Sequence, residues 1–268
     1  MAAAATDAPD GEVLRGTVLR GTVSGGTVSD DGGTLVGHPG LEALRDEVAS
    51  CTRCPLAATR TQTVFGSGSP TADLMFVGEA PGFHEDKQGV PFVGSAGQLL
   101  GKLLGGIGLT REDVWVCNVL KCRPPGNRDP QPEEIAACES HLFRQVDLIR
   151  PKVICTLGNF ATKLLSGKPD GITKVHGVPQ EVVLGGTKVL LFPIFHPAAA
   201  LYTPRMLDVL KADFDRLPAL LGLAAPAAGA PAGESAAEPV APPAALPPAL
   251  EPQPPAQPEE PAIQLGLF

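Results

Sequence analysis

The sequence has no run of about 20 apolar residues, the length that a membrane-spanning helix needs. Its Ala-rich start lacks the basic flank and the long apolar stretch of a signal peptide, so we expect none there. These absences predict a cytoplasmic protein that makes no contact with a membrane. In that compartment disulfides are rare, and clustered cysteines more often bind a metal.

An excess of basic residues is also missing, since the formal net charge is −8. The acidity lies outside the middle of the chain: residues 1–40 and 222–268 hold ten acidic residues against two arginines, and the remaining 19 acidic and 19 basic residues cancel. A neutral domain still binds phosphate groups if its cations cluster on one face. We expect Lys121, Arg123 and Arg128 to form such a cluster.

Both ends of the chain lack an apolar periodicity that would offset chain entropy. Residues 1–40 are rich in Gly, Thr, Ser, Ala and Asp, while residues 222–268 are mostly Ala, Pro, Glu and Gln and contain no Lys or Arg. We therefore predict two disordered tails. Residues 41–221 remain as one domain of ordinary size.

Within this domain, predicted strands alternate with predicted helices. Apolar runs indicate strands at residues 73–77, 114–120, 152–157, 181–184 and 188–195. Helical spacing of apolar residues indicates helices that begin near Leu41, Ser95, Pro132, Gly158 and Pro204, with Ser95 and Thr203 as caps. The alternation predicts an α/β fold whose mostly parallel sheet is covered on both faces. Ligands in such folds bind beyond the carboxyl ends of strands, where segments 78–97, 118–128 and 196–205 would lie.

The cysteines suggest a metal site. Cys51 and Cys54 form a C-x-x-C pair, and Cys122 and Cys138 supply two more thiols from distant points. Four thiolates suit either an iron–sulfur cluster or a tetrahedral zinc, and the spacing alone does not separate the two. Cys117 and Cys155 fall inside predicted strands, where we expect them to be ordinary core residues.

Several motifs, taken in order, resemble one family. They are Gly-Glu-Ala-Pro-Gly at residues 78–82, Pro-Phe-Val-Gly at 91–94, Asn-Val-Leu-Lys-Cys-Arg-Pro-Pro-Gly-Asn-Arg at 118–128 and His-Pro-Ala-Ala-Ala at 196–200. Together with the cysteine spacing, they resemble the signature segments of the family-4, iron–sulfur uracil-DNA glycosylases. The resemblance implies a three-layer α/β/α sandwich with a central, mostly parallel sheet. It also implies a 4Fe–4S cluster held by Cys51, Cys54, Cys122 and Cys138, and the excision of uracil in DNA repair.

The motif residues suit that chemistry. A uracil must leave the duplex before its glycosidic bond can be attacked. Phe92 would stack on the extruded base, beside Ala80, and the Asn118 amide would pair with N3–H and O4 of uracil. Cytosine presents the reverse pattern and would leave buried groups unpaired. By resemblance, His196 would donate to the negative charge that develops on uracil O2.

Two residues compete for the role of activating the water. The best-known branch of the superfamily has an aspartate at the position that matches Ala80, and a small residue there is usual in family 4. Glu79 and Glu85 are the two candidates, with Glu79 slightly favoured. Either carboxylate could instead orient the pocket or stabilise the cationic sugar.

The remaining predictions concern DNA and a partner. Arg123 and Arg128 would meet phosphates, and Leu201 or Tyr202 would fill the gap left by the flipped nucleotide, although family members often have Arg near Tyr202. The last residues resemble the peptide by which bacterial proteins bind the replicative sliding clamp, with Gln264, Leu265, Leu267 and Phe268 as anchors. We expect a monomer associated with the bacterial nucleoid.

The sequence supports other functions less well than uracil excision. No lysine other than Lys87 lies in the Glu and His motifs, which disfavours a lyase that needs an amine nucleophile. A covalent DNA-trapping relative has a basic loop with a histidine, whereas residues 123–128 are Arg-Pro-Pro-Gly-Asn-Arg. A non-catalytic DNA-binding module of the same fold remains the principal alternative, because of Ala80. An electron carrier would not need the Glu and His motifs.

Overall fold

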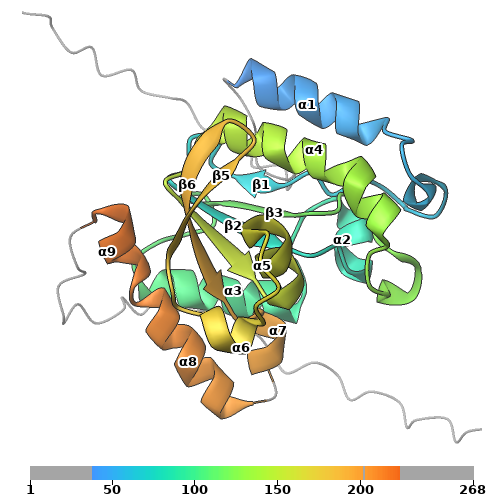
Figure 1. Cartoon of the computed structure of the whole chain (residues 1–268). Coiled ribbons are helices and arrows are strands. Elements are labelled where there is room, and N and C mark those ends of the chain that lie inside the picture. The colour runs from blue at the N-terminus through green and yellow to red at the C-terminus, as the bar shows by residue number, and fades with distance from the viewer. Residues whose placement is uncertain (1–37, 202, 224–268) are drawn as a thin grey trace, which may run out of the picture. The chain divides into compact units, whose positions relative to one another are not determined.

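The computed structural model describes residues 38–201 and 203–223. Within them lies a six-stranded sheet in the order β1-β3-β2-β4-β6-β5 (Figure 1). The strands span Ser67–Gly68 (β1), Leu74–Gly78 (β2), Trp115–Asn118 (β3), Val153–Leu157 (β4), Gln180–Leu184 (β5) and Thr187–Ile194 (β6). The four central strands run parallel, and the edge strands β1 and β5 are antiparallel to their neighbours. The predicted α/β fold with a mostly parallel sheet is confirmed.

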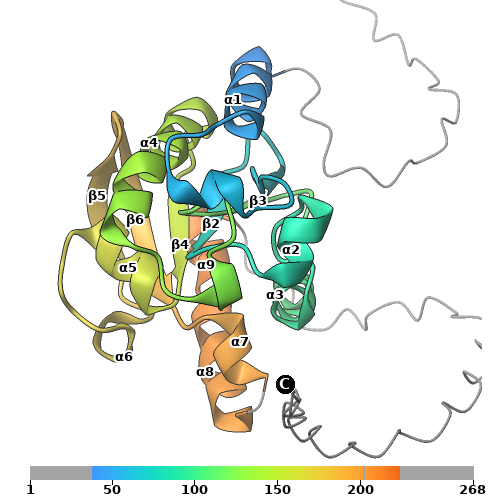
Figure 2. The same cartoon turned by 90° about the vertical axis from the view of Figure 1, so that its right-hand side faces the viewer.

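Helices cover both faces of this sheet (Figures 1 and 2). On one face, side chains of α1, α4 and α5 pack against the strands, and on the other face those of α3, α8 and α9 do so. The helices span Pro39–Ala49 (α1), Phe83–Gln88 (α2), Ser95–Gly106 (α3), Pro132–Ile149 (α4), Asn159–Ser166 (α5), Ile172–Val175 (α6), Pro197–Ala200 (α7), Pro204–Phe214 (α8) and Leu217–Leu221 (α9). Short 3₁₀ turns lie at Pro55–Ala58 and Pro125–Asn127.

Burial explains why the central strands are continuous apolar runs rather than alternating ones. Every residue of β2, β3 and β4 is buried, because helices cover both sides of the sheet. Cys117 and Cys155 are fully buried in β3 and β4, which confirms that they are core residues. Burial raises the pKa of both thiols.

Two details of the helix starts differ from the prediction. Ser95 does not cap α3: the cap position belongs to Gly94, and Ser95 is the first helical residue. Thr203 does occupy the cap position of α8, but its side chain makes no capping hydrogen bond. A serine or threonine before a helical apolar pattern thus predicted where both helices begin. It did not predict a capping hydrogen bond.

The sheet brings the candidate motifs to one edge. The segments that follow β2, β3 and β6 begin at Glu79, Val119 and Phe195, at the carboxyl ends of parallel strands. No helix among residues 38–201 and 203–223 is long and apolar enough to cross a membrane. The two tails predicted at residues 1–40 and 222–268 fall almost wholly outside these ranges, so the domain boundaries remain predictions.

Candidate functional site

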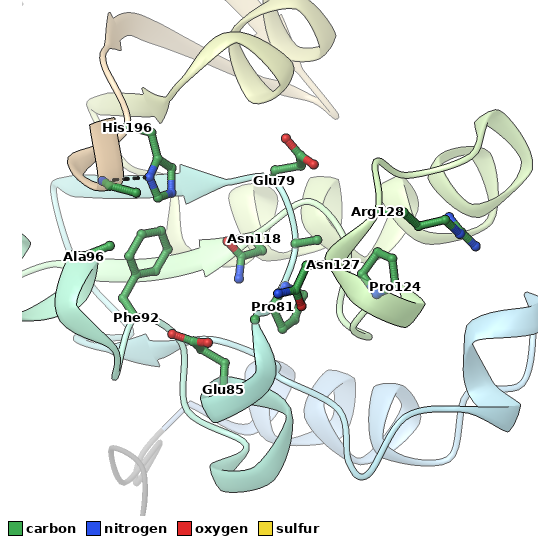
Figure 3. Close-up of a pocket in the computed structure, with 13 residues that line it drawn as sticks. Glu79, Pro81, Glu85, Phe92, Ala96, Asn118, Pro124, Asn127, Arg128 and His196 are labelled. Atoms are coloured by element: carbon green, nitrogen blue, oxygen red, sulfur yellow. Dashed lines mark hydrogen bonds between the residues drawn. The ribbon is translucent and has the colours of Figure 1, made fainter. Parts of the chain in front are cut away.

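A cavity of about 520 Å³ opens at the carboxyl ends of β2 and β3, within the size range of small-molecule sites (Figure 3). Its walls include seven of the residues singled out in the sequence: Glu79, Ala80, Glu85, Phe92, Asn118, Arg128 and His196. Pro81, Gly82, Ala96, Pro124, Asn127 and Ala198 complete the lining. Motifs that are far apart in the chain therefore meet around one space.

Gly78 forms the floor between the two central side chains. Parallel pairing sets Gly78, the last residue of β2, beside Asn118, the last residue of β3. A Cβ atom at Gly78 would lie 2.4 Å from Asn118 Oδ1 and 2.8 Å from Phe92 Cζ. The absence of a side chain at Gly78 is what lets the Asn118 amide and the Phe92 ring face the same space.

Phe92 is held in an uncommon backbone conformation. Its φ is +56°, in the left-handed region of the backbone that residues other than glycine rarely adopt. Two contacts fix the loop: Arg111 Nη2 donates to the Pro91 carbonyl at 2.9 Å, and the Phe92 carbonyl oxygen packs against Gly97, where a Cβ would lie only 1.6 Å away. The surrounding structure thus sets the direction of the ring.

His196 lies beside the Phe92 ring, with ring centroids 5.7 Å apart and an interplanar angle of 27°. Its Nδ1 accepts a hydrogen bond from the Ala198 N–H at 3.1 Å, which is the dashed line in Figure 3. Burial lowers the pKa of His196, against an opposing effect of Glu85, and favours the neutral ring. A neutral imidazole that accepts at Nδ1 carries its proton on Nε2, which is then available to a ligand.

The two candidate carboxylates have different environments. Burial, and then the charge of Asp129, raise the pKa of Glu79 above its usual value. Glu85 instead accepts a hydrogen bond from the Gly94 N–H at 3.3 Å and so helps to hold the loop that follows Phe92. The raised pKa favours Glu79 as the group that takes a proton, while Glu85 has a positioning contact.

The predicted cation cluster is partly wrong. Lys121 is 1% exposed and cannot reach a phosphate at the surface. Arg123 is half-buried: its Nε donates to Asn127 Oδ1 at 2.6 Å, and its guanidinium lies 5.2 Å from the ring centroid of the exposed Phe83. Arg128 forms two hydrogen bonds with the buried Glu134 carboxylate, and in Figure 3 it points away from the centre of the cavity.

Of the two residues predicted to fill the gap in DNA, only Leu201 is described, and it is not among the residues that line the cavity. Leu201 is half-buried directly after α7, and Tyr202 lies outside the described residues. The residues Gln264, Leu265, Leu267 and Phe268 lie outside them as well. Sequence reasoning missed Asn127, a polar side chain at the rim, although its place between Pro124 and Arg128 in the loop motif was a signal.

The four predicted metal ligands meet around a second, smaller cavity. Cys51, Cys54, Cys122 and Cys138 all line it, together with Arg60, Lys121 and His141. Among the described residues, however, no three His, Cys, Asp or Glu side chains converge closely enough to hold one metal ion. Four thiols around one space are a donor set of the kind that binds iron–sulfur clusters or zinc.

The donors around this space fit a group with negative charge. Arg60 Nη1 donates to Cys122 Sγ at 3.3 Å, and the Lys121 N–H donates to Cys138 Sγ at 3.3 Å. Both ring nitrogens of His141 are buried without a hydrogen-bond partner in the described chain, since Glu47 Oε1 lies 3.9 Å from Nδ1. Burial raises the pKa of the Cys122 thiol to about 11, so a metal that binds this sulfur has to displace its proton.

Comparison with known proteins agrees with this geometry. Residues 65–217 match the family model of the uracil DNA glycosylase superfamily, and the chain belongs to that superfamily. The type-4 uracil-DNA glycosylase of Archaeoglobus fulgidus is 47% identical over 193 residues, which cover 69% of this chain and 97% of the relative. That of Sulfurisphaera tokodaii is 48% identical over 182 residues (66% and 83%), and that of Thermotoga maritima is 50% identical over 159 residues (59% and 81%). Within the superfamily, the chain is a member of the type-4 family.

The floor of the cavity gives a first prediction. Gly78→Ala introduces a methyl group that collides with the Asn118 amide and the Phe92 ring, so we expect the cavity to lose its ability to hold a planar ligand. Binding of free uracil, measured by calorimetry, should be abolished. Gly101→Ala, whose Cβ would meet nothing within 4 Å, is the matched control and should bind as the unaltered protein does. Equal uracil affinity in both variants would contradict this account of the floor.

Proposed function

We propose that this protein removes uracil from DNA by hydrolysing the N-glycosidic bond of a deoxyuridine that has been rotated out of the helix. The observation that carries the proposal is that Phe92, Asn118 and His196, from three separate segments, line one cavity. Each has a chemical feature that uracil requires. The product is an abasic site, the first intermediate of base-excision repair.

Recognition of uracil depends on an aromatic face and an amide. The Phe92 ring stacks on the base, and Ala80 leaves room along the wall. The Asn118 amide, 2% exposed at the end of β3, offers one acceptor to N3–H and one donor to O4. Cytosine places a donor where uracil has O4 and an acceptor where uracil has N3–H, so a buried amide in this orientation rejects it.

His196 acts on the leaving group. As the C1′–N1 bond breaks, its electron pair passes to uracil, and negative charge develops on O2. The Nε2–H of the neutral imidazole donates to that oxygen and stabilises the departing anion. A protonated ring would be a stronger donor, but burial disfavours it.

Glu79 acts on the nucleophile. A water molecule attacks C1′ of the oxocarbenium-like sugar, its oxygen forms the new bond, and Glu79 accepts its proton. A carboxylate whose pKa is raised by burial accepts a proton more readily at neutral pH, which favours Glu79 over Glu85. The negative charge of Glu79 also stabilises the cationic sugar.

We also propose that Cys51, Cys54, Cys122 and Cys138 hold a 4Fe–4S cluster. When bound, it supplies a rigid cross-link between the segment after α1, the loop after β3 and α4, and the hydrolysis needs no electron from it. That loop contains Arg123 and Arg128, which we propose contact DNA phosphates as Leu201 and Tyr202 fill the gap left by the extruded nucleotide.

Uracil excision is the direct test. The brown, cluster-containing protein is incubated with single- and double-stranded oligonucleotides that carry one uracil, and alkali then cleaves abasic sites. Asn118→Ala and His196→Ala should each lower single-turnover excision by about 100-fold or more, because each removes an interaction with the flipped base. Neither variant should lose the colour of the cluster.

The other outcomes are informative. Intact strands with retained DNA binding would favour a non-catalytic module of the same fold. Covalent protein–DNA adducts would indicate trapping. Cys122→Ala, the contrasting variant, should lose colour and solubility, because it removes a ligand rather than a pocket side chain.

The pH dependence follows from the two shifted groups. Glu79 must be ionised, so kcat/KM should fall as the pH drops through a pKa that burial raises above 4.5. His196 donates from the neutral ring, and burial lowers its pKa, so the ring stays uncharged to a lower pH than an exposed histidine does. Glu79→Gln should lower kcat by about 100-fold and abolish the Glu79 part of the acid limb. Glu85→Gln is the control and should keep that limb; an unchanged acid limb in Glu79→Gln would exclude Glu79 as the base.

We further propose, from the sequence, that residues 263–268 bind the replicative sliding clamp and so concentrate the enzyme at newly made DNA in the nucleoid. Deletion of these six residues should abolish clamp binding in a surface-immobilised assay and leave turnover on short oligonucleotides intact. Clamp affinity that survives the deletion would refute the proposal.

A further inference from the structure

Lys121 is a buried cation whose hydrogen-bond partners are all neutral. Its side chain is 1% exposed, and Nζ donates to the Asn118 carbonyl at 2.8 Å and to Gln145 Oε1 at 2.6 Å. Gln145 is itself fully buried and donates to the Phe65 carbonyl at 2.9 Å. Among the ion pairs of the described chain, none involves Lys121.

Such an arrangement needs a compensating negative charge. Moving an ammonium out of water carries a large free-energy cost, and neutral acceptors offset only part of that cost. Lysines that are fully buried are therefore almost always paired with an anion. The two acceptors of the Nζ hydrogen bonds, a backbone carbonyl and a side-chain amide, are neutral, and the His141 ring lines the same cavity as Lys121.

The four cysteine thiols lie where the compensating negative charge is needed. Lys121 lines the same cavity as the four cysteines, its N–H donates to Cys138 Sγ, and Cys122 is the next residue. Four thiolates and the cluster that they bind carry net negative charge.

We propose that Lys121 is the internal counter-cation of the cluster and that it connects the cluster to the uracil pocket. The inference rests on the proposed cluster. One end of the residue contacts a ligand sulfur through its N–H, and the other end holds the carbonyl of Asn118, the residue that reads uracil. Lys121 is thus a positioning residue: it keeps the end of β3 in place, and it is stable in the core only while the anion is present.

The proposal predicts that the stability effect of one substitution changes sign with the cluster. Lys121→Met removes the charge and keeps a similar length. In the cluster-containing protein it should lower the urea midpoint of unfolding, because the anion loses its counter-charge. After the cluster has been removed with an oxidant and a chelator, the same substitution should raise the midpoint, because an unpaired buried charge has gone.

Two control variants isolate the charge. Gln145→Met removes a hydrogen bond to the same ammonium but no charge, and should lower the midpoint with and without the cluster. Lys102→Met removes an exposed charge on α3 and should change neither midpoint. If Lys121→Met shifts the midpoint in the same direction in both forms, the proposal is overturned, because the lysine then acts only through packing.

The midpoint reduction potential of the cluster gives a second readout, which decides the matter if the stripped protein does not fold. Removal of a nearby positive charge disfavours an added electron. Lys121→Met should therefore shift the potential to more negative values, as measured by redox titration with electron paramagnetic resonance, and Lys102→Met should not. An unchanged potential in Lys121→Met would exclude a counter-cation.

Excision assays separate this inference from the proposed function. With the cluster retained, Lys121→Met should lower kcat/KM for uracil-containing DNA by about tenfold, since the Asn118 carbonyl loses a charged donor. Full activity of this variant would overturn the connection to the pocket. If the unaltered protein excises no uracil, the proposed function fails. The urea midpoints of unfolding and the reduction potential of the cluster still decide the role of Lys121.

Discussion

The parallel pairing of β2 with β3 is the constraint on which the site depends. It places Gly78 next to Asn118 at the edge where both strands end, so an amide is presented to a space that a side chain would otherwise fill. The strands are apolar and sealed by helices on both faces, and this burial fixes their ends. The loops that follow can then bring Phe92 and His196 to the same space.

The two cavities differ in the charges that surround them. Around the cavity at the carboxyl ends of β2 and β3, burial lowers the pKa of His196 and raises the pKa of Glu79. Around the cysteine cavity, Arg60 and Lys121 supply cations and His141 adds a donor, which suits an anionic cluster. Lys121 belongs to both environments, because its backbone N–H donates to Cys138 Sγ and its side chain donates to the Asn118 carbonyl.

Much of this arrangement could be predicted from the sequence. Apolar runs located the strands β2 to β6, and the loop motifs identified seven residues that line the cavity. Local patterns failed where the outcome depends on tertiary contacts. Lys121 looked like a surface cation beside Arg123, yet it is buried in the segment that follows β3. Ser95 looked like a cap, yet Gly94 occupies that position. The left-handed conformation of Phe92 depends on Arg111 and Gly97, which no short motif connects.

The most direct test of the central claim is a crystal structure of the cluster-containing protein with uracil bound. The account predicts the base stacked on Phe92, with N3–H and O4 paired to the Asn118 amide and O2 within hydrogen-bonding distance of His196 Nε2. Uracil bound elsewhere, or held in this cavity without contact to Asn118 and His196, would contradict it.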